Sequence, residues 1–388
     1  MKSLLLWIAL CASSYAFEHK TTLTFQTTKY QNFESEQSIY GDMSFQIKEG
    51  SFAIESSLHY LYSHQYSQKR YLRLNELTLS KSFEHSKIQV GKMVKFWGEL
   101  EGYNISDIFN SKDYLFDPFD GSQKLGSFAV DYSYFWDNSS IELGMKLDES
   151  AIEYPNSNSP YGILPQPYIK EPQTQETIHT PSLYLKYNVT LESNSIQSEN
   201  NLILWHGYDN KRYFIPINNQ LAQYAYRVNK ALFFSNIVYD DTIFKIELAY
   251  SDVIDDSRIS DYMQIGLGVE KSIYDIKGVD INLYFQYYRY LYEEEEKIKY
   301  VDMGEVYDND LFIALKLNFN NTQTSEFKMG LLYDIKNSEK VWKSEFKTRI
   351  VDGLIFKAQY LKINAKPNTL LNNYGNSKRA IFNLTYTF

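Results

Sequence analysis

The sequence predicts an all-β protein, a transmembrane up-and-down antiparallel β-barrel of about 18 strands closed by its C-terminal strand. Three observations lead to this fold class. In the last stretch, Ser377–Phe388, the residues Phe388, Tyr386, Leu384 and Phe382 alternate with polar residues. Successive side chains of a strand point to opposite faces, so this segment has one apolar and one polar face. Similar alternating segments recur along nearly the whole chain, and its first residues have the pattern of an export signal.

The N-terminal stretch Met1–Ala16 predicts a secretory signal peptide. It has a charged Lys2, a short apolar core and the small-x-small end Ser14-Tyr15-Ala16. This pattern is too short to span a bilayer and is removed on export, so the mature chain is expected to start near Phe17. A lipoprotein signal at Cys11 is the alternative, although the large Leu10 before it fits such a signal poorly.

The composition narrows the classes of protein that fit the chain. No stretch after the signal approaches the ~18 consecutive apolar residues of a transmembrane helix. The mean hydropathy of −0.43 is that of a soluble protein, but barrel strands are only half apolar and give the same value. Aromatic residues make up 16% of the chain, which suits the membrane–water interface. A tyrosine-rich extracellular β-protein is the alternative. The net charge of −9 gives no sign of nucleic-acid binding.

The mature chain is expected to form one barrel domain, residues 17–388, in which about 18 alternating segments are strands. Roughly 16 is the alternative count, because Leu191–Asn219 is difficult to divide into strands. The expected strands are Glu18–Gln31, Ile39–Lys48, Ser51–Tyr62, Arg70–Phe83, Lys87–Trp97, Lys124–Trp136, Ser139–Asp148, His179–Thr190, Ser198–His206, Tyr224–Val238, Thr242–Ile254, Asp261–Ile273, Val279–Tyr292, Asp310–Phe319, Thr324–Ile335, Val341–Val351, Leu354–Lys362 and Ser377–Phe388.

The connections between these strands alternate in length, as an up-and-down barrel requires. Tight links such as Asp137-Asn138 and Asp352-Gly353 follow even-numbered strands, whereas Gly98–Gln123 and Glu149–Ile178 follow odd-numbered ones. Barrels of this kind have short periplasmic turns and longer extracellular loops, so both chain ends are expected on the periplasmic side. Most of the nine prolines lie in or next to the second long connection, which is therefore expected to be loop rather than strand.

Charged residues fall on the faces of the expected strands that are not apolar. A charge facing lipid at the bilayer midplane costs roughly 2–4 kcal/mol, so these side chains are expected to line a water-filled pore. The alternative is a filled lumen in which opposite charges tie neighbouring strands together; a barrel of about 16 strands or more is too wide for side chains alone to fill. The predicted pore-lining residues are Glu142, Lys146, Asp148, Lys186, Lys245, Glu247, Lys316, Asp334, Lys343, Glu345, Lys347, Arg349, Lys357 and Arg379.

The first long loop carries a motif. Val90-Gly91-Lys92 is followed by Trp97-Gly98-Glu99 and then by Asp107 to Asp113, which reads D-x-x-N-x-x-D. This resembles the segment V-G-K-x-x-x-x-W-G-E…D-x-x-N-P-x-D of a family of large, mostly uncharacterised outer-membrane barrels, and Ser111 stands where that pattern has Pro. The resemblance implies an outer-membrane channel or export barrel and names no substrate. The chain's end on Phe388 likewise resembles the strand that outer-membrane barrels present to their assembly machinery.

The same loop is long and apolar, which leads us to expect that it folds into the barrel and narrows the bore. A lid packed on the outer rim is the alternative. A calcium site at Asp113, Asp117 and Asp120 is weaker, because their spacing is not that of a known calcium loop. The predicted constriction-loop residues are Lys92, Trp97, Glu99, Glu101, Asp107, Asn110 and Asp113.

We therefore expect an outer-membrane porin of a Gram-negative bacterium that lets small hydrophilic solutes or ions diffuse passively, with neither cofactor nor metal. Catalysis is not expected, since no His is followed two residues later by Ser, as the outer-membrane phospholipases require, and acidic turns such as Asp255-Asp256 are commonplace. The alternatives are a barrel dedicated to one fatty or aromatic substrate, and a non-conducting structural or adhesin barrel. The sequence leaves the oligomeric state open between monomer and trimer.

Overall fold

The computed structural model describes residues 16–156, 158–162, 168–292, 301–302, 307–367, 369 and 371–388. Almost all of the expected signal peptide lies outside these residues. The barrel strands are β1 (Ala16–Tyr30), β2 (Glu36–Glu49), β3 (Phe52–Ser63), β4 (Arg70–Ser82), β5 (Ser86–Met93), β6 (Ser127–Trp136), β7 (Ser139–Lys146), β9 (Ser182–Ser193), β10 (Ile196–Tyr208), β13 (Arg227–Tyr239), β14 (Thr242–Val253), β15 (Tyr262–Ile273), β16 (Asp280–Tyr292), β18 (Asn309–Asn318), β19 (Glu326–Asp334), β20 (Lys340–Val351), β21 (Leu354–Asn364) and β22 (Lys378–Thr387).

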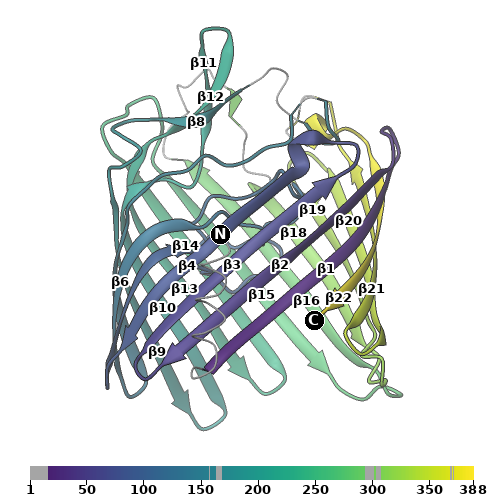
Figure 1. Ribbon diagram of the computed structural model, residues 1–388, viewed down its shortest axis with the longest axis horizontal. Coiled ribbons are helices and arrows are strands. Elements are labelled where there is room, and N and C mark those ends of the chain that lie inside the picture. Colours follow the sequence, from purple (N-terminus) through teal and green to yellow (C-terminus); the bar gives the residue numbers. More distant parts are fainter. Residues whose placement is uncertain are drawn as a thin grey trace, which may run out of the picture.

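These strands form one closed antiparallel barrel, which confirms the predicted fold class (Figure 1). Within the described residues the sheet has 18 strands, and each pairs with its neighbour in the chain. Closure comes from β1 and β22, where Thr22 lies opposite Thr387 and Tyr30 opposite Arg379. A closed sheet satisfies every backbone donor and acceptor without an open edge, which hydrocarbon surroundings demand.

The alternation of exposure along the strands explains why these segments form a barrel. On β22 the side chains of Phe382, Leu384 and Tyr386 are about two-fifths exposed on the outer wall, whereas Arg379 and Asn383 are buried inside. Ile381, which interrupts the sequence pattern, is buried with the inward-facing residues. The outer wall is thus apolar and the inner wall mixed, as the alternating sequence predicts.

The two ends of the barrel differ in the length of their connections. Turns at one end are short, and residues with positive φ occupy several of them: Gly50, Asp137, Asp240 and Gly353. Gly adopts this conformation freely and Asp tolerates it, so these dipeptides suit tight hairpins. Long connections lie at the other end, together with the η1 (Ser67–Lys69) and η2 (Leu371–Tyr374) turns.

The structure moves several strand ends, among them both ends of the first long loop, and adds a small sheet. The strands expected at 87–97 and 124–136 are shorter, so the first long loop runs over 94–126. The proline-rich connection is not all loop: β8 (Tyr168–Thr174) joins β11 (Tyr213–Ile217), β12 (Gln220–Ala225) and β17 (Val301–Asp302) in a second sheet, whose hairpin projects beyond the barrel (Figure 1). Pro172 falls where the β8–β12 register shifts, so no regular ladder bond is lost there. Within the described residues, no helix is long and apolar enough to cross a membrane.

Candidate functional site

The loop over residues 94–126, hereafter the inner loop, lies inside the barrel. Its apolar side chains Trp97, Leu100, Ile105, Ile108 and Phe109 are at most 4% exposed. They pack against inward-facing residues of the wall. The wall residues include Tyr184 of β9, Trp205 of β10, Leu232 and Phe234 of β13, Ala249 of β14 and Tyr288 of β16. The loop therefore covers the side of the inner wall formed by β9 to β16 and is not a lid on the outer rim.

Polar contacts fix the same part of the inner loop. Glu247 of β14 accepts hydrogen bonds from the backbone N–H groups of Glu99 (2.6 Å), Leu100 (3.1 Å) and Ser106 (2.9 Å). Glu101 forms an ion pair with Lys245, whose Nζ also lies 3.1 Å from Glu270. The loop's own backbone donors are thus satisfied by side chains of the wall, since it has no strand ladder here.

The base of the inner loop is held by Asn110 and two lysines. The Asn110 side chain accepts from the Lys95 N–H (2.7 Å) and donates to the carbonyls of Met93 and Leu125, so it ties the two ends of the loop together. Lys95 lies 2.7 Å from Asp131 and 2.6 Å from Glu142.

Lys124 and Asp107 form a second contact at this base, with 2.5 Å between Nζ and Oδ1. Burial lowers the pKa of the Lys124 ammonium to about 8, and the charge of Asp107 offsets only part of this effect.

The tip of the inner loop reaches the opposite side of the barrel. Asp113 accepts from Arg73 of β4 at 2.7 Å, and Arg73 also binds Glu153 at 2.6 Å. Asp117 accepts two hydrogen bonds from Arg379 of β22, at 2.8 and 2.7 Å. Burial by itself would raise the pKa of Asp117, but the Arg379 guanidinium outweighs it and holds that pKa below its usual value. Asp113 and Asp117 thus belong to separate ion pairs, which argues against a shared calcium site.

The inward faces of β18 to β21 carry partly exposed charges outside the area covered by the inner loop. Lys316 lies opposite Lys328, and Lys347 lies opposite Lys357. The Nζ atoms of Lys316, Lys328 and Lys347 lie 3.6, 3.5 and 3.6 Å from the Glu326 carboxylate. The side chains of Lys328, Lys347 and Lys357 are 47%, 41% and 33% exposed, so this lysine-rich wall faces water inside the barrel.

Two of the hollows among the described residues bear on the path of a solute. One, of about 600 Å³, is lined by inward-facing polar residues of β1 to β5, including Lys20, Ser44, Glu55 and Glu76, together with Lys95 of the inner loop. It belongs to the lumen below the loop.

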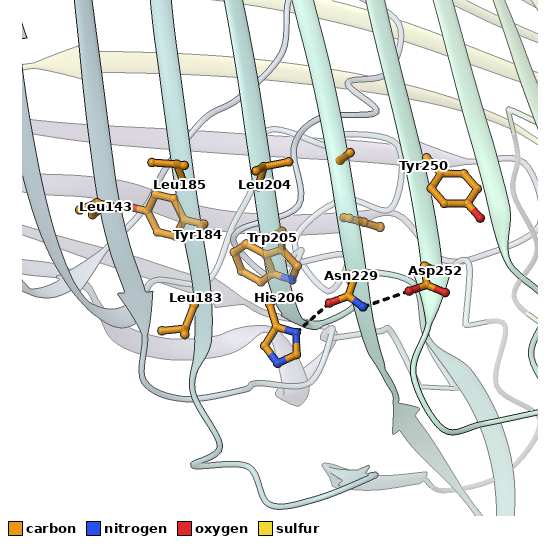
Figure 2. Close-up of a pocket in the computed structure, with 12 residues that line it drawn as sticks. Leu143, Leu183, Tyr184, Leu185, Leu204, Trp205, His206, Asn229, Tyr250 and Asp252 are labelled. Atoms are coloured by element: carbon orange, nitrogen blue, oxygen red, sulfur yellow. Dashed lines mark hydrogen bonds between the residues drawn. The ribbon is translucent and has the colours of Figure 1, made fainter.

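The other hollow has a volume of about 660 Å³ and lies on the outer wall. Figure 2 shows its outward-pointing Leu183, Leu204 and Tyr250 beside a row in which Asn229 bonds to His206 (2.8 Å) and to Asp252 (3.0 Å). Because it opens on the apolar outer surface, it is not part of a solute path.

The structure places the predicted residues in four groups. Lys316, Lys343, Glu345, Lys347, Arg349 and Lys357 are on the inward face of β18 to β21. The second group lies in the inner loop or on the wall that the loop contacts: Glu142, Lys245, Glu247, Trp97, Glu99, Glu101, Asp107, Asn110 and Asp113. Lys186 belongs to the same region, where its Nζ lies 5.7 Å from the centre of the Phe234 ring. The third group is buried near the barrel end that carries the long connections. There Lys146 contacts Glu149, Asp334 contacts Asn337, and Arg379 contacts Asp117. Lys92 and Asp148 lie elsewhere.

Lys92 is not in the inner loop, contrary to expectation. It lies on β5 at the same parity as Ile88 and Val90, both 42% exposed on the outer wall, and its Nζ donates to the Leu74 carbonyl. Asp148 follows β7 and accepts from the Phe128 N–H.

Sequence reasoning missed Glu326, Lys328 and Arg73, and it considered Asp117 only as a calcium ligand, not as the partner of Arg379. Alternation with Phe327 and Met329 marks the first two as inward-facing, whereas no local signal identifies the partners of Arg73 and Asp117.

Comparisons with known proteins bear on the fold. No family model matches the chain, and no curated protein matches it. Three solved Pseudomonas aeruginosa proteins are similar in structure. OccK3 (OpdO) has a TM-score of 0.58 at 10% identity over 96% of this chain and 95% of its own. OccK8 (OprE) has a TM-score of 0.54 at 8% identity over 96% and 98%. OpdK, solved with vanillate, has a TM-score of 0.55 at 10% identity over 96% and 98%. At these identities the likeness establishes the shared barrel fold.

Within the described residues, no group of His, Cys, Asp or Glu is arranged to hold a metal ion.

Proposed function

We propose that the chain is an outer-membrane porin through which small hydrophilic solutes or ions diffuse passively. The observation that carries this proposal is the division of the lumen. The inner loop covers the wall from β9 to β16, while lysines on β18 to β21 remain partly exposed. Buried, fully paired charges would indicate a filled barrel; partly exposed ones indicate water beside them. The apolar outer wall supports an outer-membrane location after removal of the leader, with outer-membrane lipid as its surroundings and Phe388 as the signal to the assembly machinery.

In this proposal the inner loop is the constriction. Glu99, Glu101 and Asp113 hold it to the wall through Asn236, Lys245 and Arg73, whereas Asp107 and Asn110 tie segments of the loop base together. The inward lysines and glutamates of β18 to β21 line the remaining path. In the ion pairs on this face, Lys316, Lys328, Lys347 and Lys357 share two carboxylates, Glu326 and Glu345, which leaves two positive charges in excess among these six residues (four minus two). Surplus charge of one sign in a confined path raises the local concentration of the opposite ion. We therefore expect a preference for anions.

A substrate-dedicated channel is the second candidate, and one local feature favours it. Beside Lys316 and Lys328 the wall carries the small residues Ala314 and Gly330 and the ring of Phe312, which lies 3.2 Å from a Cβ built on that glycine. A small organic anion with an apolar body fits both parts of this surface. The similar barrel OpdK is solved with vanillate, an aromatic carboxylate, which agrees in chemical class.

The test is conduction by the purified, refolded full-length mature chain in a planar bilayer. A porin gives discrete conductance steps, and a salt gradient gives a reversal potential of the sign expected for anions. Added vanillate should shorten open times if the dedicated-channel candidate is correct, whereas acetate should not. A correctly folded barrel that never conducts would refute the porin proposal and favour a structural or adhesin barrel. Deletion of 102–117 should raise the conductance step, and an unchanged step would refute the constriction role.

A further inference from the structure

Glu247 is a buried carboxylate whose partners are backbone groups. Its side chain is 0% exposed, and no ion pair between described residues includes it. Instead both carboxylate oxygens accept backbone hydrogen bonds: Oε1 from Glu99 and Leu100, and Oε2 from Ser106. Successive backbone N–H groups that converge in this way form an anion-binding nest. Here the anion is supplied by the wall and the nest by the inner loop.

The wall around Glu247 is shaped to receive the same segment. On β15 two inward-facing glycines, Gly266 and Gly268, lie under Leu100. A Cβ built on them would come within 2.5 and 2.8 Å of the Leu100 methyl groups. Any larger residue there would have to displace the Leu100 side chain, so the glycines form a socket for this leucine. Ala249, at 1% exposure, continues the surface of small residues.

Two further loop amides are bonded by side chains of β16. The Gly102 N–H donates to Gln286 Oε1 at 3.0 Å, and the Tyr103 N–H donates to the Tyr288 hydroxyl oxygen at 3.0 Å. The segment from Glu99 to Ser106 therefore curls around Glu247 with its amides turned toward the wall. Glu247 alone serves three of these amides and lies at the centre of the group.

We propose that Glu247 is the positioning residue that fixes the inner loop to the wall and thereby sets the aperture of the channel. This inference rests on the proposed porin function for its consequence, but the docking itself is a property of the loop. A carboxylate is required because a glutamine of the same shape has one acceptor oxygen. Its NH₂ group would point at the N–H of either Ser106 or the Glu99–Leu100 pair. The substitution Glu247→Gln therefore removes hydrogen bonds without changing the side-chain volume.

A thiol reporter tests the docking without relying on conduction. Ser106 is 0% exposed and, within the part of the chain that the structure describes, its Oγ has no hydrogen-bond partner, so Ser106→Cys is a small change. The one native cysteine is Cys11, in the expected leader. In the reporter alone the thiol should react slowly with a water-soluble maleimide. With Glu247→Gln added it should react at least about tenfold faster, because a buried thiol reacts only from the opened population.

The matched control is Glu345→Gln, the same change on the open wall. Among the described residues Glu345 accepts from Gln359 (2.6 Å), lies 3.9 Å from Lys357, and forms no hydrogen bond or ion pair with the inner loop. It should leave the reporter's rate within a factor of about two. In bilayers, Glu247→Gln should add open-channel noise and larger conductance substates, whereas Glu345→Gln should change ion preference without adding noise. Glu247→Asp keeps the charge on a shorter arm and should give intermediate values.

The outcomes separate the inference from the proposed function. A reporter that reacts equally fast with and without Glu247→Gln, or as fast in the control, overturns the positioning role. If Glu247→Gln fails to refold, as judged by heat-modifiable migration in gels, the Glu247→Asp reporter decides in the same way. A wild-type barrel that does not conduct, combined with a reporter released only by Glu247 variants, refutes the porin proposal and leaves the positioning role supported.

Discussion

The ion pair between Asp117 and Arg379 gives the most direct test of how the inner loop is held. We predict that Asp117→Asn destabilises the folded barrel. Asp117 is 14% exposed and Arg379 6%, and two hydrogen bonds of 2.8 and 2.7 Å join them. Breaking a buried pair by removing one partner costs about 3–5 kcal/mol, because the remaining charge is left uncompensated. The rings of Phe119 and Tyr161, 5.2 and 5.5 Å from the guanidinium carbon, still face that charge. We therefore expect a loss near the lower value, about 3 kcal/mol.

The assay is denaturant unfolding in detergent micelles, followed by tryptophan fluorescence. The free energies of unfolding of variant and wild type are compared at one shared m-value, the slope of that free energy against denaturant concentration. Asp120→Asn is the matched control in the same loop, because among the described residues the Asp120 side chain hydrogen-bonds only to Ser122, in a local turn. It should cost about 1 kcal/mol or less.

The pH dependence supplies a second check of this pair. The folded pKa of Asp117 is depressed below the ordinary 3.8, so its contribution is complete above pH 3.8 and is lost as pH falls through the folded value. The difference between wild type and Asp117→Asn should therefore be constant near neutrality and shrink only below pH 3.8. A substitution that costs no more than the control, or a difference that disappears already at pH 5 to 6, would show that the pair does not hold the loop.

Three further predictions follow from the same contacts. Glu326→Gln should raise the preference for anions roughly twofold to fivefold, since it removes about 0.5–1 kcal/mol of screened attraction for cations. Reversal potentials in a salt gradient measure this preference. An unchanged reversal potential would place Glu326 outside the path of the ions. Gly268→Leu should expel Leu100 from its socket and enlarge the conductance step. Overpacking should also lower the free energy of unfolding by about 1–3 kcal/mol. A conductance step equal to that of the wild type would contradict the role of the socket. Burial lowers the pKa of Lys124 to about 8 from 10.5, so between these values the unfolded chain holds more protons and the free energy of unfolding should rise with pH. In Lys124→Met this rise between pH 7 and 10 should be absent, as measured by unfolding at several pH values. If the free energies of unfolding of variant and wild type change in parallel with pH, the lowered pKa of Lys124 is contradicted.

Much of the barrel could be predicted from local sequence. Each predicted strand overlaps an observed one, and the turn dipeptides Asp137-Asn138 and Asp352-Gly353 lie where the turns are. The period of two is a property of consecutive residues, and the short turns need residues that accept positive φ; neither depends on distant parts of the chain. Where the local pattern was weaker, the boundaries shifted. The strand expected at 87–97 ends at Met93 because the following residues turn inward.

The sequence by itself determined a closed barrel with an apolar outside, a charged inside and one long apolar loop between β5 and β6. Only the tertiary structure decided what that loop does. Its amide groups meet Glu247 from 141 to 148 residues away, and Asp117 meets Arg379 across 262 residues. A carboxylate carries no mark in the sequence of whether it faces water or a neighbour's backbone, so Glu247 and Glu345 look alike until the loop lies on one of them. The physical reason is that strand and turn preferences are local, whereas burial and charge pairing depend on which surfaces the closed sheet brings together.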